Sequence, residues 1–307
     1  MSTSSTSTST SGTGELRFAP VRLDGATLAR YGELFKACFP GTDKFTPSYL
    51  AWLYVDNPDG QAVGYDAWDG ERLAAHYVCI PARAWVEGRE VPVLLSLNTA
   101  THPDYQGKGL FTKLAAMSYE AGQAAGFDGV YGVANANSTP GFVRKLGFQL
   151  VRPLEARVGL GGLRHGPKPP AASLSFERSW SAAALRWRCA NPHNPVFLKQ
   201  GGGKLRFHAA ASGHKLPAYA ELDADVLGLP VPDAAPQSPQ APAPALSPLR
   251  LFIGLAPDAT SSYWNYASIP MRLRPSPLNL IYRSFAPRVT ALDPARIAFS
   301  FLDFDAY

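Results

Sequence analysis

The 307-residue sequence predicts a mixed α/β (α+β) fold, with a mostly antiparallel sheet flanked by helices and a second, smaller α+β half. Segments of apolar and polar residues in strand-like alternation are joined by tight glycine-containing turns. One glycine-bearing turn, after the strand expected over 91–101, opens an amphipathic helix. Strands and helices do not alternate regularly, so repeated βαβ units are not expected. The length suggests two domains of ordinary size.

Caps and turns set the element boundaries. Thr46 followed by Pro47 is typical of a helix start, because the hydroxyl caps early N–H groups and proline fits the first turn. The pairs Asp69-Gly70 and Glu87-Gly88 favour turns between strands. These signals predict helices over residues 26–38, 47–55, 110–125 and about 139–146, and strands over 64–68, 73–85, 91–101, 129–134, 148–158 and 297–307.

Composition narrows the class of protein. The hydrophobic fraction of 46% is normal for a globular chain, and no apolar run reaches the roughly 18 residues that cross a bilayer. The net charge of +5 is spread along the chain and does not form the basic stripe typical of nucleic-acid binding. Cys38, Cys79 and Cys189 are too scattered for a disulfide framework or a zinc site. We therefore expect a cytoplasmic protein without a metal, a nucleic-acid partner or a membrane partner.

Two stretches have low complexity. Residues 1–14 are almost wholly Ser, Thr and Gly, which bury too little apolar surface to offset the entropy of ordering. Residues 232–248 are rich in proline and alanine, a composition typical of an extended loop or linker. We predict a disordered tail at the first stretch and a loop insert at the second.

The segment 99–114 carries the strongest functional signal. A strand ends near Pro103, a Gln-Gly-Lys-Gly loop follows at 106–109, and an amphipathic helix begins at Leu110. Glycines let backbone amides turn toward a ligand. The first N–H groups of a helix lack intrahelical partners and lie at the positive end of its dipole. The segment therefore predicts a binding site for a phosphate or diphosphate.

This segment resembles the acetyl-CoA-binding motif of the GNAT acetyltransferase superfamily, Arg/Gln-x-x-Gly-x-Gly/Ala after a strand and at the start of a helix. Gln106 and Gly109 match the motif, whereas Phe111 stands where the family usually has Gly or Ala. The resemblance implies a GNAT-like fold and an acetyl-CoA (acyl-CoA) cosubstrate. The loop residues that it places on the cofactor are Gln106, Gly107, Lys108, Gly109, Leu110 and Phe111.

A second landmark follows at the expected spacing. The segment 135–148 ends in Lys-Leu-Gly-Phe and is similar to the end of the family's acyl-CoA fold. The resemblance implies that Asn137, or Asn135, hydrogen-bonds the pantetheine arm. It also implies that the backbone of Thr99 and Thr101 pairs with that arm like an added strand. We therefore predict a GNAT acyl-CoA-binding catalytic domain over residues 15–160.

The catalytic pair that many family members use is absent. Val143 occupies the position of their tyrosine acid, and the strand before the loop offers Ser96 and Asn98 but no carboxylate base. His102 at the strand end is the candidate that passes a proton through water. A histidine before a proline also often packs against the loop or caps it, and that alternative stays open.

The missing base bears on the acceptor. An amine of pKa about 10.4, like a lysine side chain, requires roughly 4.6 kcal/mol to be deprotonated at pH 7. An amine near pKa 8 requires only about 1.4 kcal/mol. A site without a carboxylate therefore suits a small amine of low pKa, an amino sugar first and an amino acid or peptide N-terminus second.

The second half contains a sequence pattern similar to one in the first half. Leu-Ala-Trp at 50–52, followed by Asn57-Pro58, has a counterpart in Leu-Arg-Trp at 185–187, followed by Asn191-Pro192. A strand, a turn and a second strand follow each, with His76 and His208 in the same order. We interpret residues 167–307 as a degenerate GNAT-like domain without its own coenzyme A loop. Chance similarity of two helix-plus-hairpin units is the alternative.

Taken with the resemblance, these features predict an N-acyltransferase that moves an acetyl or other short acyl group from acyl-CoA to a small-molecule amine. The backbone near Thr99 to Thr101 would polarise the thioester, and the amine would attack it directly. Two alternatives remain at this point: a non-catalytic acyl-CoA-binding or scaffold protein, and a protein or peptide N-acetyltransferase. The sequence is compatible with a monomer or a homodimer.

Overall fold

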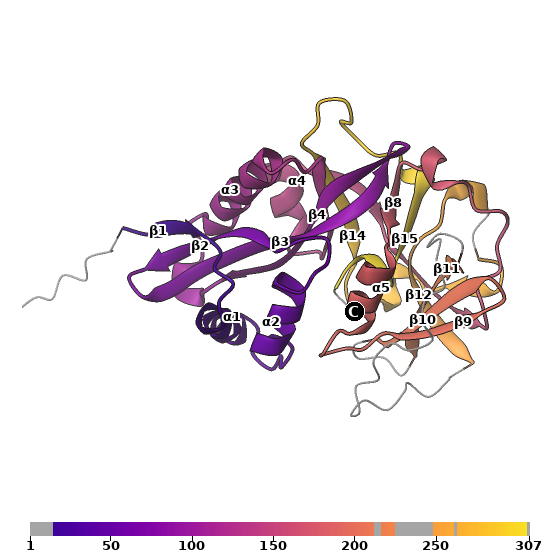
Figure 1. Cartoon of the computed structure of the whole chain (residues 1–307), viewed down its shortest axis with the longest axis horizontal. Coiled ribbons are helices and arrows are strands. Elements are labelled where there is room, and N and C mark those ends of the chain that lie inside the picture. Colours follow the sequence, from indigo (N-terminus) through magenta and orange to yellow (C-terminus); the bar gives the residue numbers. More distant parts are fainter. Residues whose placement is uncertain (1–14, 212–215, 225–247, 261–262, 306–307) are drawn as a thin grey trace, which may run out of the picture.

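The computed structural model describes residues 15–211, 216–224, 248–260 and 263–305 (Figure 1). The predicted tail at 1–14 and residues 232–247 of the predicted insert lie outside these ranges. In the described chain, no helix is long and apolar enough to cross a membrane.

The helices are α1 (Gly25–Cys38), α2 (Pro47–Tyr54), α3 (Leu110–Ala124), α4 (Thr139–Leu146) and α5 (Ala182–Cys189). The strands up to residue 160 are β1 (Arg17–Pro20), β2 (Val63–Asp69), β3 (Arg72–Val86), β4 (Arg89–Thr101), β5 (Gly129–Ala134), β6 (Gln149–Pro153) and β7 (Glu155–Leu160). Those that follow are β8 (Phe176–Ser179), β9 (Phe197–Gly201), β10 (Lys204–Ala210), β11 (Pro217–Asp223), β12 (Leu249–Leu255), β13 (Tyr266–Ser268), β14 (Asn279–Ser284) and β15 (Ile297–Ser300).

Side-chain caps lie at the start of α1 and α2. The Asp24 carboxylate accepts the Thr27 N–H at 3.1 Å at the start of α1. The Thr46 hydroxyl accepts the Tyr49 N–H at 3.2 Å at the start of α2, with Pro47 in the first turn. Each cap satisfies an N–H that has no intrahelical partner. The helix start predicted at Thr46 and Pro47 is therefore confirmed.

The strands form one continuous sheet. Its first part runs β1-β2-β3-β4-β5-β14-β6, antiparallel except between β4 and β5. β14 comes from near the end of the sequence, yet it lies between β5 and β6. The far end of β3 pairs with β8, from which the sheet continues through β15, β12, β11 and β10 to β9. The predicted mostly antiparallel sheet flanked by helices is confirmed.

The predicted bounds of two strands are partly wrong. The strand predicted over 148–158 is two strands, because its two parts pair with different segments of the chain. β6 pairs with β14, whereas β7 pairs with β12 and β13. The closing strand predicted over 297–307 ends at Ser300. There the Asp303 carboxylate accepts the Ser300 N–H at 2.6 Å, and this capping box turns the chain into a short 3-10 helix, η7 (Phe301–Asp303).

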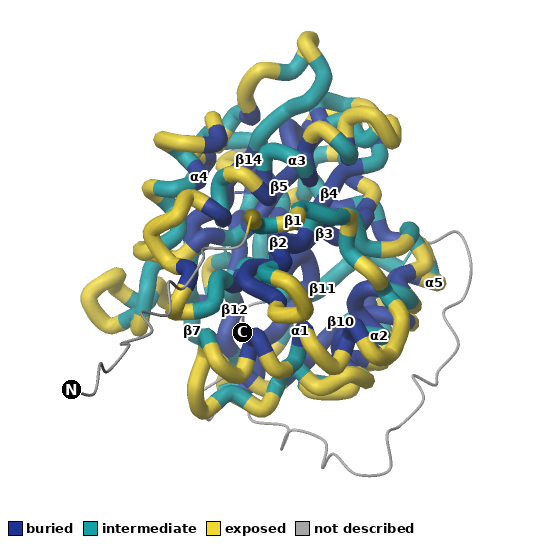
Figure 2. Tube along the Cα trace, turned by 90° about the vertical axis from the view of Figure 1, so that its left-hand side faces the viewer, coloured by how far each residue is buried: buried dark blue, intermediate teal, exposed yellow. Residues whose placement is uncertain are grey.

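The helices cover opposite faces of the first part of the sheet. In Figure 1, α3 and α4 lie on one side of β2, β3 and β4, and α1 and α2 lie on the other. Apolar residues of α3 and α4 form a core with one face of the strands, and residues of α1 and α2 form another that extends into the second half. Figure 2 shows the buried segments (dark blue) following the strands through the middle of the molecule.

Candidate active site

β4 and β5 pair over a short stretch and then separate. The paired residues are Leu94–Val130, Leu95–Tyr131 and Ser96–Gly132. Beyond them β4 continues to Thr101 beside β3, and β5 continues to Ala134 beside β14. In the described chain, the β5-facing edge of β4 from Leu97 to Thr101 has no strand partner. An extended ligand fits such an edge as an added strand.

A bulge in β4 lies where the separation begins. Val78 of β3 faces Leu97 and His76 faces Ala100, so β4 carries an extra residue between these pairs. Asn98 adopts φ 46°, a left-handed value that asparagine tolerates better than most residues. Bulges of this kind bend the strand and redirect its side chains. The Asn98 side chain points to the α2 face, where its Nδ2 donates to the Tyr54 hydroxyl at 3.0 Å.

The predicted cofactor loop has the backbone of an anion site. Gly107 and Gly109 have φ values of 78° and 72°, and Gly109 caps α3 without a side-chain hydrogen bond. The hydrogen bonds of the described residues include none donated by the backbone N–H groups of 107–112. Residues 106–109 are exposed. These amides therefore lie at the positive end of the α3 dipole, available to an anion.

Basic and amide side chains border this loop. The Lys108 ammonium lies 4.8 Å from the Tyr105 ring centroid, and the Lys113 ammonium lies 3.7 Å from the Phe18 ring centroid. The Gln106 Nε2 donates to the Thr101 carbonyl at 3.4 Å, which ties the loop to the end of β4. The structure therefore brings Gln106, Lys108 and the β4 edge together.

Leu110 and Phe111 have packing roles. Leu110 is buried, and the Phe111 ring contacts Phe142 with centroids 5.2 Å apart. A Cβ added at Gly141 would lie 3.0 Å from the Phe111 ring. The bulky residue at 111 is thus accommodated by a glycine in α4. Both residues contribute backbone N–H groups to the loop while their side chains pack inward.

His102 caps a turn in this structure. Its Nδ1 accepts the Asp104 N–H at 3.2 Å at the start of the short helix η1 (Pro103–Tyr105). The Arg72 guanidinium lies 3.0 Å from its Nε2 and also pairs with Asp104 at 2.7 Å. These contacts favour the loop-capping interpretation. The catalytic role of His102 stays a prediction.

The two asparagines after β5 differ. The Asn135 Oδ1 accepts the N–H groups of Asn137 and Ser138 at 3.0 and 2.9 Å, which shapes the turn into α4. Asn137 is exposed at that turn. Of the two, Asn137 is the one whose side chain suits contact with a ligand beside β5. Asn279 of β14 donates to Thr139 at 2.9 Å, so a late segment of the chain also supports this turn.

A buried polar chain behind Asn98 was missed by the sequence analysis. The Tyr54 hydroxyl lies 3.2 Å from His76 Nε2, and His76 Nδ1 lies 2.7 Å from an Asp66 carboxylate oxygen. The Tyr31 hydroxyl donates to the other oxygen of Asp66 at 2.7 Å. His76 and Asp66 are almost completely buried. The signal in the sequence was a histidine and an aspartate at facing positions of two adjacent strands.

The end of the chain lies against the α2 face. The Tyr131 hydroxyl of β5 donates to the Asp303 carbonyl at 3.0 Å, and Arg178 of β8 donates to that hydroxyl at 3.2 Å. Lys44 and Arg188 pair with Asp305 at 2.7 and 3.3 Å. Burial opposes ionisation of Asp305, but these cations hold its pKa below the ordinary value. The second half thus encloses the side of the sheet opposite α3.

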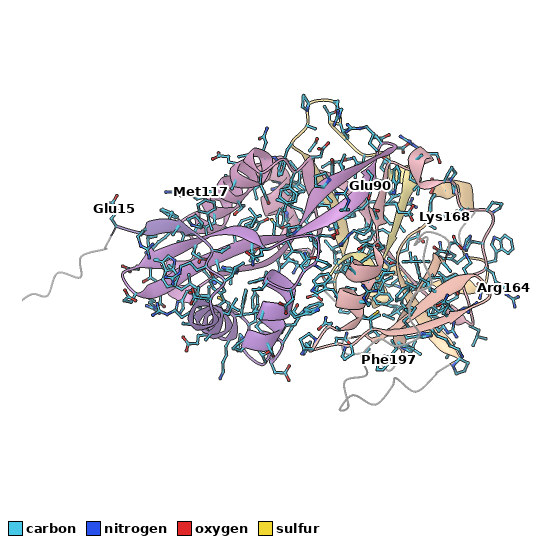
Figure 3. All side chains as sticks on the ribbon, viewed as in Figure 1. Glu15, Glu90, Met117, Arg164, Lys168 and Phe197 are labelled. Carbon is cyan, nitrogen blue, oxygen red and sulfur yellow. The ribbon has the colours of Figure 1, made fainter. Side chains whose placement is uncertain are left out.

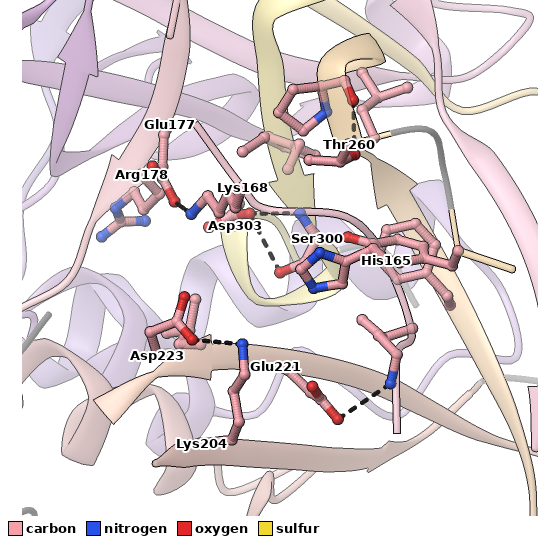
Figure 4. Close-up of a pocket in the computed structure, with 18 of the residues that line it drawn as sticks. His165, Lys168, Glu177, Arg178, Lys204, Glu221, Asp223, Thr260, Ser300 and Asp303 are labelled. Carbon is pink, nitrogen blue, oxygen red and sulfur yellow. Dashed lines mark hydrogen bonds and ion pairs between the residues drawn. The ribbon is translucent and has the colours of Figure 1, made fainter. Parts of the chain in front are cut away.

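A cavity in the second half carries many charged groups (Figure 4). Lys168 pairs with Glu177, and Lys204 pairs with Asp223. Asp303 accepts from Ser300 at its edge, and burial raises the pKa of this carboxyl to about 6. These cations and anions neutralise one another, so the arrangement indicates a polar packing region between strands. The opening between β4 and β5 remains the better candidate.

Comparisons with known proteins point to the same region. Residues 22–151 match the family model described as an acetyltransferase (GNAT) domain. No curated protein sequence matches the chain significantly.

Solved structures share the fold over most of the chain. A GCN5-related N-acetyltransferase from Anabaena variabilis is 11% identical with a TM-score of 0.55, over 87% of this chain and 72% of that one. A GCN5-related N-acetyltransferase from Kribbella flavida is 12% identical with a TM-score of 0.55, over 89% and 72%. A probable N-acyltransferase from Enterococcus faecalis is 12% identical with a TM-score of 0.54, over 88% and 73%.

The matched segment contains the glycine loop with α3 and the segment 135–148, on which the family resemblance was founded, together with the separated strands β4 and β5. The GNAT family uses acetyl-CoA. Residues 22–151 therefore match a GNAT acetyltransferase domain, and the chain shares its fold with GCN5-related N-acetyltransferases.

Proposed function

We propose that the protein transfers an acetyl or other short acyl group from acyl-CoA to the amine of a small molecule, an amino sugar before other amines. The observation that carries the proposal is the unpaired edge of β4 next to the free amides at the start of α3. A thioester on that edge would place its diphosphate at the helix start.

The loop supports the cofactor part of the proposal. Backbone N–H groups from Gly107 to Phe111 would bind the diphosphate, with Lys108 adding a positive charge. The edge residues Thr99 and Thr101 would pair with the pantetheine arm, and Asn137 would contact it from the β5 side. Gly107 and Gly109 fit this role, because their left-handed backbone aims successive amides outward.

The bulge supports the chemical part. A backbone N–H near Thr99 would polarise the thioester carbonyl, and a bound amine would attack its carbon. From Val91 to Thr101, β4 carries no carboxylate that could act as a base, so an amine that is readily deprotonated at pH 7 is favoured.

We infer that residues 167–307 are a degenerate copy of the first half. After α2 and α5 alike, an Asn-Pro turn leads into a strand pair. Asn57 Oδ1 accepts the Asp59 N–H at 3.1 Å, and Asn191 Oδ1 accepts the His193 N–H at 2.9 Å. This half supplies β14 to the first half's sheet and covers the α2 face, so it would complete the acceptor cleft.

Release of free coenzyme A from acetyl-CoA tests the proposal. The amine panel is glucosamine, glycinamide and Nα-acetyl-lysine amide, and thiol release above the water blank is measured for each. Turnover is expected with glucosamine or glycinamide, and calorimetry is expected to show acetyl-CoA binding. Binding of acetyl-CoA without thiol release for any amine would contradict the acceptor class, and lysine turnover above the other two would favour a lysine acceptor.

A further inference from the structure

Asn98 lies between the proposed thioester position and the buried polar chain. Asn98 is half-buried, whereas Tyr54, His76 and Asp66 behind it are buried. The residue belongs to the part of β4 whose outer edge has no strand partner. Because the cofactor loop and α3 occupy the opposite face, an amine would approach from the face to which Asn98 points.

The hydrogen bonds of the buried polar chain all donate in one direction, toward Asp66. The Asp66 carboxylate accepts from the Tyr31 hydroxyl at one oxygen, so the other oxygen accepts His76 Nδ1–H. His76 Nε2 then faces the Tyr54 hydroxyl, 3.2 Å away. Burial raises the pKa of Tyr54 well above its ordinary value, so this hydroxyl keeps its proton.

This direction fixes the amide of Asn98. The Tyr54 oxygen accepts from Asn98 Nδ2 at 3.0 Å, which leaves the Tyr54 proton for His76 Nε2. The carbonyl Oδ1 therefore points away from Tyr54. The hydrogen bonds of the described residues include none donated to this oxygen. A planar amide held at one end presents its acceptor in a defined direction.

The second half contains a comparable unit, α5 with the hairpin β9–β10, that lacks this polar chain. A helix can therefore pack on such a hairpin without it. Matched by order after the two Leu-x-Trp helices and by strand register, Cys189, Phe197 and His208 occupy the positions of Tyr54, Asp66 and His76. Phe197 is labelled on β9 in Figure 3. His208 Nε2 is buried without a hydrogen-bond partner in the described chain. The unit folds there with Cys189 and Phe197 in place of Tyr54 and Asp66, so its packing does not depend on the polar chain.

We propose that Asn98 Oδ1 accepts a hydrogen bond from the acceptor amine, and that Tyr54, His76 and Asp66 are positioning residues that hold this oxygen toward it. The inference rests on the proposed function and names the group that replaces the missing carboxylate. An amide oxygen carries no net charge, so it binds the amine without stabilising its ammonium form as a carboxylate does. It therefore favours amines that lose a proton readily.

The transfer is balanced without a further reactant. The amine nitrogen forms a bond to the acyl carbon, and the carbon–sulfur bond breaks. The proton that the nitrogen loses ends on the released thiol. Asn98 takes up no proton; it orients the nitrogen so that its lone pair faces the thioester.

Three variants test the proposal. Asn98→Gly deletes the amide but keeps a residue that adopts φ 46° without strain, so it separates the amide from its backbone role. Asn98→Asp keeps an acceptor oxygen and also tolerates this backbone. Tyr54→Phe removes the hydroxyl that orients the amide. Tyr282→Phe is the matched control, because Tyr282 is equally buried on β14 and lies outside this face's polar chain.

The assay measures kcat and KM for glucosamine, glycinamide and Nα-acetyl-lysine amide at saturating acetyl-CoA, together with calorimetric binding of acetyl-CoA. For the preferred amine, Asn98→Gly is expected to lower kcat/KM about tenfold or more, and Tyr54→Phe about three- to tenfold. Asn98→Asp is expected to keep most of the amine KM but to lower kcat, because Asp has no N–H for the Tyr54 oxygen and its charge stabilises the ammonium form. Acetyl-CoA affinity should stay within about twofold in all variants, as in Tyr282→Phe.

The outcomes are distinguishable. If Asn98→Gly turns over the amine like the wild type, asparagine serves only the bulge and the inference is wrong while the proposed function stands. If acetyl-CoA affinity falls together with amine turnover, the residue has a structural role and the inference is also wrong. If the wild type turns over none of the amines, the proposed function fails, and the inference fails with it.

Discussion

Trp52 and Trp187 donate to each other's backbone. The indole N–H of Trp52 donates to the Trp187 carbonyl at 2.8 Å, and that of Trp187 donates to the Trp52 carbonyl at 2.8 Å. Their rings stack with centroids 4.8 Å apart and planes 17° apart. Both occupy the third position of a Leu-x-Trp sequence on α2 and α5. The two reciprocal hydrogen bonds join α2 to α5, and the pair has a local two-fold arrangement.

We expect this pair to stabilise the contact between the halves as a unit. Trp52→Phe and Trp187→Phe each remove a buried indole hydrogen bond, and the Trp187 carbonyl keeps the Ala190 N–H as a donor, so we expect a loss of about 1–3 kcal/mol of unfolding free energy, smaller for Trp52→Phe. The double variant should lose less than the sum, by about 0.5–1.5 kcal/mol. Urea denaturation measures this coupling. Trp264→Phe, at a side chain 68% exposed, should change stability by less than about 0.5 kcal/mol. Strict additivity would show that the rings act independently.

Gly109→Glu is expected to weaken acetyl-CoA binding at least tenfold, about 1.4 kcal/mol, because it places a negative side chain beside the helix start. The matched control is Gly126→Glu. Gly126 follows the other end of α3, has φ 87° against 72° at Gly109, and also has open space around it. Both variants add one negative charge at a glycine with positive φ. They differ in that Gly109 lies at the start of α3 and Gly126 after its end. Calorimetry should therefore show normal affinity in Gly126→Glu, and equal losses in both would contradict the diphosphate site.

The acceptor preference predicts a pH profile. Below the pKa of the acceptor amine, its neutral fraction rises tenfold per pH unit, so kcat/KM should rise with that slope. For an amine of pKa about 8 the profile should level off near pH 8, whereas a lysine-like amine should keep rising toward about pH 10. Rates at several pH values for glycinamide and Nα-acetyl-lysine amide check this. A flat profile for both would indicate that the enzyme itself removes the proton.

The raised pKa of Asp303 predicts a loss of stability as pH rises. The carboxyl titrates near pH 6 in the folded protein and near pH 3.9 unfolded, so the unfolded chain ionises first. Between about pH 4 and pH 6 this group should lower the unfolding free energy by about 3 kcal/mol, and below pH 4 the loss should vanish. Asp303→Asn should lack this part of the pH dependence. Denaturant unfolding at pH 4 and pH 7 measures the difference, and the same slope in both proteins would contradict the assignment.

Several elements were predictable because their causes are local. The cap at Thr46, the turns at Gly70 and Gly88 and the helix start after Gly109 depend on a few adjacent residues, and the observed bounds agree with the predicted ones within one or two residues. The split after Pro153 was not local in cause. It was missed because both sides are strand-like, and only the partners β14 and β12 separate them.

The candidate site likewise has one part that is predictable from local sequence and one part that is not. The cofactor loop is one continuous segment, so its glycines and the helix behind it are readable along the chain. The polar chain from Asn98 to Asp66 joins α2, β2, β3 and β4, and its members are 10 to 44 residues apart in sequence. No local pattern marks such a cluster, because each residue alone is compatible with an ordinary core or loop role.

The sequence by itself determined the glycine loop, its helix and the GNAT resemblance, because short-range backbone preferences and adjacent residues specify them. Only the tertiary structure decided that β14 lies between β5 and β6 and that Asn98 is backed by a buried histidine and carboxylate. Both depend on contacts between distant segments. Their pairing is selected by burial and hydrogen bonding in the assembled sheet, and not by the residues next to them in the chain.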